Sequence, residues 1–355
     1  MKIAIISTQP HFCIGGIERT LRLKYSFLAE NNDVTEYPLV RRKKNRMEKP
    51  NKFVKIDYLL AKDEIGANLK MTAYKKKNLQ HIYNNNDVVI LETFDPPRKW
   101  LRHKKSILVQ HSDFKTYTPF KKGVAITIGG FFINIFFNIG TFFNPLKKSA
   151  KTVTFIEHKN IKNSVAISLP ANYENQISVK NPKRKRKGFV WIARLDDESK
   201  DLIALAKLSN LYGNISIYGD GPDKKLLIQN LEKKEFYKGF LEHEKVQKIM
   251  STSKATLITS KYEGFPNTIV ESLSTGTPVV LFDTFTTAKF FETSGAAFLV
   301  EKNDIEGYAN KLKWLDSLND EEYKKIQIKA IDFAKKYLSF ESYEYKWKTL
   351  LSEYK

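Results

Sequence analysis

The sequence has 355 residues, which is more than one ordinary hydrophobic core requires, and its length therefore favours two domains. The composition, with 42% apolar and 28% charged residues, excludes a fibrous or wholly disordered protein, and the one cysteine, Cys13, excludes an internal disulfide. The formal net charge of +21 indicates a surface suited to a polyanion.

The positive charge belongs to the first half of the chain. Residues 1–187 contain 36 Lys and Arg against 14 Asp and Glu, whereas residues 188–355 contain 24 against 25. This asymmetry favours a polyanionic partner for the first half alone, such as a membrane with anionic lipids or a nucleic acid. The alternative is a lysine-rich surface that serves only solubility.

The first predicted strand is Ile3–Ile6, and a helical pattern follows at Glu18–Glu30. The N-terminal residues lack the apolar run and cleavage site of a signal peptide, so we expect a reducing, cytoplasmic location. Gly15 and Gly16 lie between the two elements, where glycine lets the backbone approach a ligand closely. A simple turn would use the same two glycines.

Further short apolar or β-branched runs alternate with helical patterns and predict a parallel sheet with helices on both faces. The runs are Val88–Leu91, Ser106–Val109 and Thr152–Ile156. His111 comes at the end of the second of these runs. A lone histidine at such a position is compatible with a ligand contact, but also with a surface or core residue.

The segment Val124–Phe143 has 20 residues without charge, six of them phenylalanine, between Lys121-Lys122 and Lys147-Lys148. Its length would allow a bilayer span, but the strands before and after it are expected in one sheet, which disfavours a crossing. Two interpretations remain open. The segment is either a helix buried against the first sheet or an interfacial element that dips into the membrane.

A second series of strands begins after Asn181–Lys187 (NPKRKRK), a polar, self-repelling run that predicts an interdomain linker. The strands are Gly188–Ala193, Ile215–Tyr218, Phe236–Lys238, Ala255–Thr259 and Pro278–Phe282. We therefore expect a first domain at residues 1–187, a second at 188–338, and a C-terminal helix from about 339 to 355.

The segment Lys261–Leu281 carries the strongest functional pattern. Glu263 and Glu271 stand eight positions apart, separated by a Gly-Phe-Pro-Asn turn and the start of an apolar helix. A helix start offers unpaired N–H groups and the positive end of the dipole to a phosphate, whereas carboxylates accept hydrogen bonds from hydroxyls. A phosphate next to a polyol indicates a nucleotide sugar. The turn residues expected to contribute backbone N–H groups are Phe265, Asn267, Thr268 and Ile269.

Arg194 and Lys200 follow the predicted strand Gly188–Ala193, six positions apart. A guanidinium and an ammonium that converge on a diphosphate would neutralise the charge that grows on a leaving group. The alternative is an unremarkable pair of surface cations. No His or Cys cluster has the spacing of metal ligands, so we expect neither a metal nor another cofactor.

Taken in order, six motifs resemble the retaining glycosyltransferases of family 4. They are GGIER at Gly15–Arg19, VQHS at Val109–Ser112, ARL at Ala193–Leu195 with Lys200, YGDGP at Tyr218–Pro222, KGFL at Lys238–Leu241, and the Glu-x7-Glu segment. The resemblance implies the α/β GT-B fold, with two Rossmann-like doubly wound domains facing across a cleft. It also implies a C-terminal helix that returns to the first domain.

The resemblance also implies a role for each matching residue. The catalytic candidates are Arg194 and Lys200 at the donor's phosphates and Glu263 and His111 at the transferred sugar. The donor-binding candidates are Gly15, Gly16 and Gly219 near the phosphates, Phe240 near the nucleobase and Glu271 at the ribose hydroxyls. The leaving phosphate oxygen would take the acceptor's proton, so no base, nucleophile or metal is needed. The sequence departs from the family's usual glycines at Ala193, at Asp201 and at Thr286–Ala288.

We therefore expect a retaining glycosyltransferase that moves a hexose from a nucleotide-diphosphate sugar to a membrane-associated or cell-envelope glycan or lipid acceptor. It would be peripheral on the inner face of the cell membrane, at an anionic lipid surface. Basic runs such as Arg41–Arg46 lack interleaved aromatic residues, so nucleic acid is not an expected partner. The alternatives are a nucleotide-sugar epimerase or phosphorylase on the same fold, or a non-catalytic polyanion-binding protein.

Overall fold

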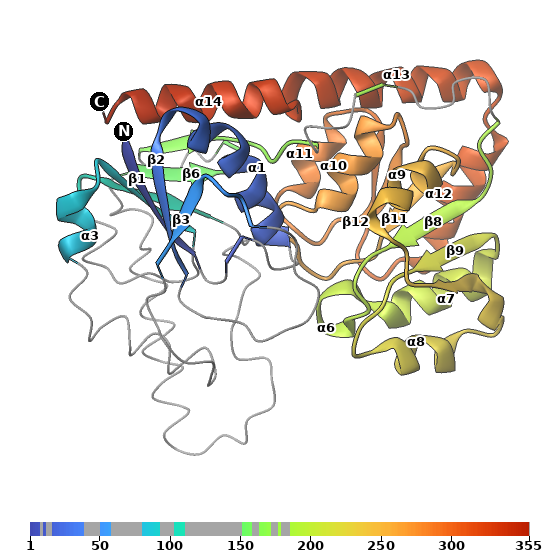
Figure 1. Cartoon of the computed structure of the whole chain (residues 1–355). Helices are drawn as coiled ribbons and strands as arrows, with labels where there is room; N and C mark the ends of the chain where they lie inside the picture. Colours follow the sequence, from blue (N-terminus) through green and yellow to red (C-terminus); the bar gives the residue numbers. More distant parts are fainter. Residues whose placement is uncertain are drawn as a thin grey trace, which may run out of the picture. The chain divides into compact units, whose positions relative to one another are not determined.

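The structure is a computed structural model of the chain, and it describes residues 1–7, 10–11, 16–38, 50–57, 80–92, 103–110, 151–157, 163–171, 177–178 and 185–354. These residues form two compact units (Figure 1). The first unit consists of the described parts of Met1–His111, Thr118–Ser168 and Glu344–Lys355, and the second includes those of Leu169–Tyr343.

The first unit contains a sheet of seven strands in the order β3-β2-β1-β4-β5-β6-β7, and every neighbouring pair is parallel. The strands are β1 (Lys2–Ser7), β2 (Asp33–Pro38), β3 (Val54–Ile56), β4 (Val88–Glu92), β5 (Ser106–Val109), β6 (Lys151–Thr154) and β7 (Ser164–Ala166). Helix α1 (Gly16–Asn31) connects β1 to β2, and α3 (Gln80–Asn85) precedes β4.

The second unit contains a parallel sheet of six strands in the order β10-β9-β8-β11-β12-β13. The strands are β8 (Phe189–Ile192), β9 (Ile215–Tyr218), β10 (Tyr237–Gly239), β11 (Ala255–Ile258), β12 (Val279–Phe282) and β13 (Ala297–Val300). The helical elements are α6 (Asp197–Lys200), α7 (Leu202–Tyr212), α8 (Lys224–Asn230), η2 (Lys234–Phe236), α9 (His243–Met250), α10 (Asn267–Ser274), α11 (Ala288–Glu292), α12 (Ile305–Ser317) and α13 (Asp320–Tyr337). Two parallel α/β sheets confirm the predicted fold class.

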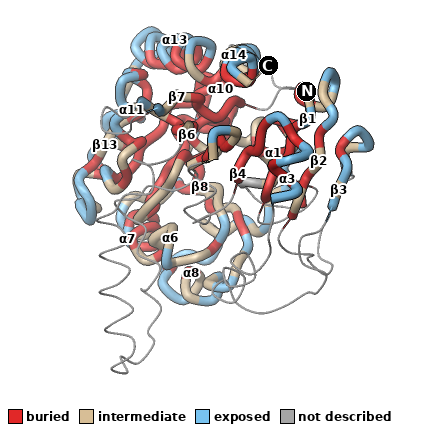
Figure 2. Tube along the Cα trace, turned by 90° about the vertical axis from the view of Figure 1, so that its left-hand side faces the viewer, coloured by how far each residue is buried: buried red, intermediate tan, exposed pale blue. Residues whose placement is uncertain are grey.

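The core of each unit lies along its sheet. Strands β4, β5, β11 and β12 consist entirely of buried residues, as expected for parallel strands that are covered on both faces. In Figure 2 the interior of each unit is mostly buried, in red, while the outer faces of the helices are exposed, in pale blue. The regular interior places the strand ends, and the loops that follow them, at defined positions.

The C-terminal helix α14 (Phe340–Ser352) carries buried residues that hold it to the first unit. Trp347, Leu350 and Leu351 are buried, and the ammonium of Lys24 on α1 lies 4.2 Å from the centre of the Trp347 ring. Lys151 Nζ is 2.7 Å from Glu353 Oε2, in the residues that follow the helix. The stretch Glu344–Lys355 therefore belongs to the first unit although it lies at the end of the chain.

The interdomain linker at Asn181–Lys187 stays a prediction, but Arg186, near the end of this run, is buried in the second unit. Its guanidinium donates to the carbonyl oxygen of Thr275 at 2.8 Å and to the hydroxyl of Thr277. Thr275 ends α10, so the cation lies where the negative end of the helix dipole attracts it. Burial lowers the pKa of Arg186, and the two threonine oxygens compensate part of the lost hydration with hydrogen bonds.

The apolar segment Val124–Phe143 lies outside the described residues, so both interpretations of it remain predictions. In the part of the chain that the structure describes, no helix has the length and apolar character that a bilayer span requires.

Candidate functional site

The candidate site lies at the carboxyl ends of the strands in the second unit. Strand β8 is the first strand of this sheet in the chain; β9 and β10 lie on one side of it, and β11, β12 and β13 lie on the other. The direction of addition therefore reverses between β8 and β11, and ligands of open α/β sheets bind in the crevice that such a reversal creates. The segments that leave this point follow β8, from Ala193 to Lys200, and β11, from Thr259 to Glu263.

The structure brings two of the predicted catalytic residues together at this point. The ammonium of Lys200, at the end of α6, forms an ion pair with Glu263 Oε1. The hydroxyl of Ser260 donates to the same carboxylate oxygen at 2.8 Å. The side chains of Lys200 and Glu263 are 20% and 16% exposed, so the pair remains partly accessible. A bound phosphate could therefore take the place of Glu263 beside the ammonium.

Arg194 follows β8 directly, and its side chain is exposed. Within the described residues its guanidinium forms neither a hydrogen bond nor an ion pair. The backbone around it is fixed, because Leu195 is fully buried and its N–H donates to the carbonyl oxygen of Asp220 at 3.0 Å. A guanidinium that extends from a fixed backbone, without a partner among the described residues, is suited to an anionic ligand.

Helix α10 begins beside these residues with backbone donors that the described protein leaves free. Its N-cap residue is Pro266, which offers no side-chain acceptor. The N–H groups of Ile269 and Val270 donate back to the Pro266 carbonyl oxygen, at 3.0 and 3.4 Å. Those of Asn267 and Thr268 find no acceptor in the described part of the chain. The helix start therefore offers two N–H groups and the positive end of a dipole.

The turn before α10 is held in place by packing and by one hydrogen bond. The buried ring of Phe265 lies 4.9 Å from that of Phe291 on α11, centre to centre. The hydroxyl of Thr287 donates to the carbonyl oxygen of Gly264 at 2.9 Å. Thr287 thus gives a structural use to the stretch Thr286–Ala288, where the family usually has glycines. Further along α10, Glu271 is the helix's one charged residue and is buried.

Gly219 and Phe240 follow the neighbouring strands β9 and β10, at the same edge of the sheet. Gly219 has a φ of +153°, and a Cβ atom there would overlap the carbonyl oxygen of Ala193. Packing against β8 therefore explains this glycine by itself, and its contact with a phosphate stays a prediction. Phe240 is 53% exposed, which leaves its ring accessible to a ligand.

Asp201 stands where the family often has glycine, and the structure explains both choices. Its φ of +52° lies in the left-handed region, which glycine adopts freely and Asp tolerates. Its carboxylate accepts from the N–H of Ala204 at 3.2 Å and caps α7. The ammonium of Lys261 lies 3.8 Å from the same oxygen and balances its charge.

Two residues of the site were not predicted from the sequence. Ser260 contacts Glu263, and Lys261 contacts Asp197 and Asp201, which flank Lys200 in the chain. A serine and a lysine beside a motif give no signal in one sequence, because any exposed loop contains such residues. Two predicted residues, Gly15 and His111, lie outside the described part of the chain, and Gly16 is the first residue of α1. Their roles stay predictions.

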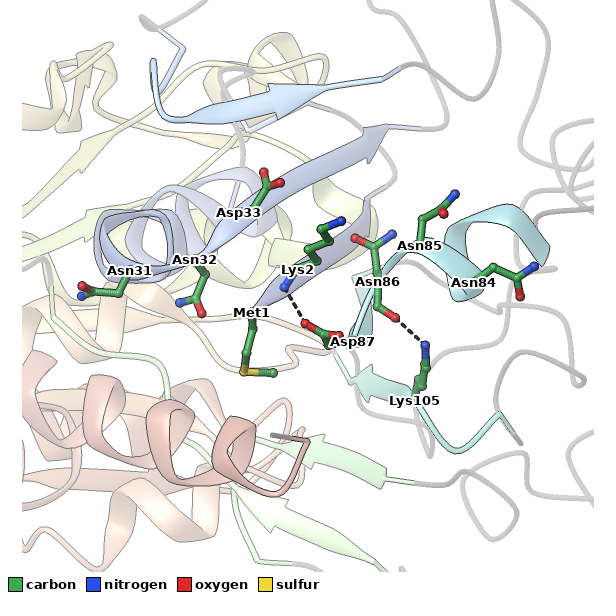
Figure 3. A pocket seen from close by; sticks show the side chains of 10 residues that line it. All are labelled: Met1, Lys2, Asn31, Asn32, Asp33, Asn84, Asn85, Asn86, Asp87 and Lys105. Atoms are coloured by element: carbon green, nitrogen blue, oxygen red, sulfur yellow. Dashed lines mark hydrogen bonds between the residues drawn. The ribbon is translucent and has the colours of Figure 1, made fainter.

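The first unit has a hollow of about 590 Å³ at the opposite, amino-terminal edge of its sheet (Figure 3). It is lined by Met1, Lys2, Asn31, Asn32, Asp33, Asn84, Asn85, Asn86, Asp87 and Lys105. Lys105 Nζ donates to the Asn86 carbonyl oxygen at 2.6 Å, and the backbone N–H of Lys2 donates to Asp87 Oδ2 at 2.7 Å. None of the predicted site residues lies in it.

Two parallel, doubly wound units, one with a basic and acidic cluster at its strand ends, define a protein of the GT-B fold. The solved structure of sucrose-phosphate synthase from Thermosynechococcus elongatus has a similar fold, with a TM-score of 0.73, 14% identity, and coverage of 99% of this chain and 98% of that one. Residues 173–333 match the family model described as "Glycosyl transferases group 1". This match assigns residues 173–333 to that family.

Two curated relatives align with less than half of the chain. A poly(ribitol-phosphate) alpha-N-acetylglucosaminyltransferase of Staphylococcus aureus (strain COL) is 30% identical over 142 residues, which are 38% of this chain and 28% of the relative. A lipopolysaccharide 1,6-galactosyltransferase of Escherichia coli (strain K12) is 29% identical over 160 residues, 41% of this chain and 44% of the relative. The chain thus spans less than half of the length of either relative.

Proposed function

We propose that the chain is a retaining glycosyltransferase that transfers a hexose from a nucleotide-diphosphate sugar to a glycan or lipid acceptor of the cell envelope. The observation that carries the proposal is the cluster at the β8–β11 reversal. It combines an exposed Arg194 without a described protein partner, a Lys200 that a phosphate could reach, and the two free N–H groups of α10.

The proposed mechanism places the donor's diphosphate against these groups. As the bond between the sugar and the diphosphate breaks, negative charge grows on the leaving oxygen, and Arg194 and Lys200 stabilise it. The start of α10 adds hydrogen bonds to the phosphates. Glu263, once a phosphate replaces it beside Lys200, accepts a hydrogen bond from a sugar hydroxyl. The acceptor hydroxyl attacks from the same face and passes its proton to the leaving phosphate oxygen.

The proposed acceptor follows from the curated relatives and from the charge. Both relatives are named for transfer to envelope polymers, a poly(ribitol-phosphate) and a lipopolysaccharide. We assign the donor to the second unit and the acceptor to the first, because residues 1–187 carry the whole charge excess. An acceptor at the inner face of the membrane would place the first unit against anionic headgroups, which attract each nearby Lys or Arg by about 1 kcal/mol.

Replacing Glu271 with glutamine should weaken the binding of the donor's nucleotide diphosphate by roughly 10- to 100-fold. Glutamine keeps the size of this buried side chain but removes the charged acceptor for ribose hydroxyls, and hydrogen bonds to charged groups are worth about 1.5–3 kcal/mol. Isothermal titration against UDP, GDP and ADP identifies the nucleotide and measures the change. The 2′,3′-dideoxy form of that nucleotide should bind the variant and the parent protein alike. An equal loss for both forms would show that Glu271 does not meet the ribose.

The membrane assignment predicts that the protein floats with liposomes that contain anionic lipid and stays behind with neutral ones. The charge of residues 1–187 supplies the attraction, so raising the salt from 0.1 to 1 M should release the protein as the screening length falls from about 10 to 3 Å. Flotation that ignores both lipid charge and salt would contradict the electrostatic argument. It would favour apolar insertion of Val124–Phe143 instead.

A further inference from the structure

The loop that carries Lys200 is tied to the segment that carries Glu263 by backbone contacts as well as by the ion pair. The hydroxyl of Thr259 donates to the carbonyl oxygen of Lys200 at 2.6 Å. The N–H of Lys261 donates to the carbonyl oxygen of Ser199 at 2.8 Å. The backbone at Ser199 and Lys200 is therefore fixed by hydrogen bonds from the residues that follow the neighbouring strand β11.

The side chain of Lys261 completes this attachment. Its ammonium donates to the carbonyl oxygen of Asp197 at 2.8 Å and to Asp197 Oδ2 at 3.0 Å, and it lies 3.8 Å from Asp201 Oδ1. Asp197 and Asp201 are two of the four acids that flank Lys200 in the chain, the others being Asp196 and Glu198. The side chain of Lys261 is 34% exposed, and those of Asp197 and Asp201 are 24% and 15% exposed. Water therefore screens these interactions only in part.

The two acids are a problem for a diphosphate site. Asp197 lies three positions before Lys200 and Asp201 directly after it, so each would repel a diphosphate bound at Lys200 or compete with it for the ammonium. In the structure, other groups compensate the charges of these two carboxylates. Asp197 Oδ1 accepts from the N–H of Leu202 at 2.7 Å and Asp201 accepts from that of Ala204, so both cap α7. Lys261 supplies a full positive charge to both.

We propose that Lys261 is a positioning residue for the binding of the donor's diphosphate. It contacts no ligand itself. It occupies Asp197 and Asp201, keeps them away from Lys200, and so leaves the Lys200 ammonium free to exchange Glu263 for a phosphate oxygen. The inference rests on the proposed function, since it concerns the same nucleotide site.

A purely structural clamp would explain the same contacts, and the test must separate the two roles. Lys261→Met removes the charge but keeps most of the apolar stem, and Lys261→Arg keeps the charge. Lys311→Met is the matched control, because it removes one ammonium from α12, where Lys311 lies over the ring of Trp314. Thermal unfolding of each variant measures any loss of stability separately from binding.

The experiment is a double-mutant cycle that combines Lys261→Met with Lys200→Met. Isothermal titration measures the affinity of each variant for two ligands. They are the nucleoside diphosphate (UDP, GDP or ADP) that the unmodified protein binds, and the nucleoside without its phosphates. Lys261→Met should weaken the diphosphate about tenfold, at the low end for a lost charged hydrogen bond, and the nucleoside not at all. Lys261→Arg should recover most of the binding, and Lys311→Met should bind as the parent protein does. In the Lys200→Met background, Lys261→Met should cause no further loss, because its effect passes through Lys200.

Each other outcome has a distinct meaning. Unchanged diphosphate binding in Lys261→Met overturns the positioning role and leaves the donor site intact. Equal losses for diphosphate and nucleoside, or losses that add to those of Lys200→Met, reduce Lys261 to a structural clamp and overturn the inference as well. A parent protein that binds no member of the panel contradicts the proposed function itself, and the inference then fails with it.

Discussion

Arg194→Ala should lower kcat by roughly 10²- to 10³-fold with little change in stability. The estimate follows from enzymes in which one preorganised donor to a developing anion was removed, at a cost of about 2.7–4 kcal/mol. Stability should persist because the side chain is exposed and has no partner among the described residues. Donor turnover is measured with the acceptor present, and thermal unfolding is measured alongside.

Two further variants make the Arg194 result specific. Arg194→Lys keeps the charge but not the planar, bidentate donor group, so its kcat should fall between those of the parent and of Arg194→Ala. Lys313→Ala removes an exposed cation from α12, away from the strand ends, and should leave turnover unchanged. If Arg194→Ala turns over like the parent protein, Arg194 has no role in the reaction.

Gly219→Ala should destabilise the second unit by at least about 4 kcal/mol, which places it among the most damaging single substitutions. The new Cβ atom would overlap the Ala193 carbonyl oxygen, a backbone atom that cannot move without disturbing β8. The φ of +153° adds strain for any residue with a side chain. Thermal unfolding should show a midpoint lowered by roughly 10 °C or more, or a protein that fails to fold.

Gly213→Ala is the matched control for this substitution. Gly213 also has a positive φ, +73°, but no atom lies within 4 Å of the position its Cβ would take. The control therefore measures backbone strain alone, about 1–3 kcal/mol. Similar midpoints for Gly219→Ala and Gly213→Ala would show that the turn after β9 relaxes, and that packing does not require the glycine.

The sequence predicted those strands whose residues are uniformly apolar or β-branched. Ile3–Ile6, Val88–Leu91 and Ser106–Val109 agree with β1, β4 and β5 within one residue at either end. It missed β2 (DVTEYP), because one of its buried positions is held by an acid, Glu36, and a proline ends it. Strand β13 was missed as well, since Ala297–Val300 is too short an apolar run to be distinguished from a helix segment.

The candidate site was predictable in its residue types but not in its contacts. Lys200 and Glu263 are 63 positions apart, and only the parallel pairing of β8 with β11 brings them together. The same strand pairing brings Lys261 to Asp197 and Asp201, and no local sequence pattern predicts these contacts. Asp201 stood out in the sequence only as a departure from glycine, whereas the structure shows that it caps α7 and that Lys261 lies 3.8 Å from it.

A crystal structure of the protein with its nucleotide diphosphate at saturating concentration tests the central claim most directly. We expect the phosphate oxygens within hydrogen-bonding distance of Arg194, of Lys200 and of the N–H groups that begin α10, with Glu263 released from Lys200. A nucleotide bound elsewhere, with Lys200 still paired to Glu263 and the start of α10 free of ligand, would contradict the account.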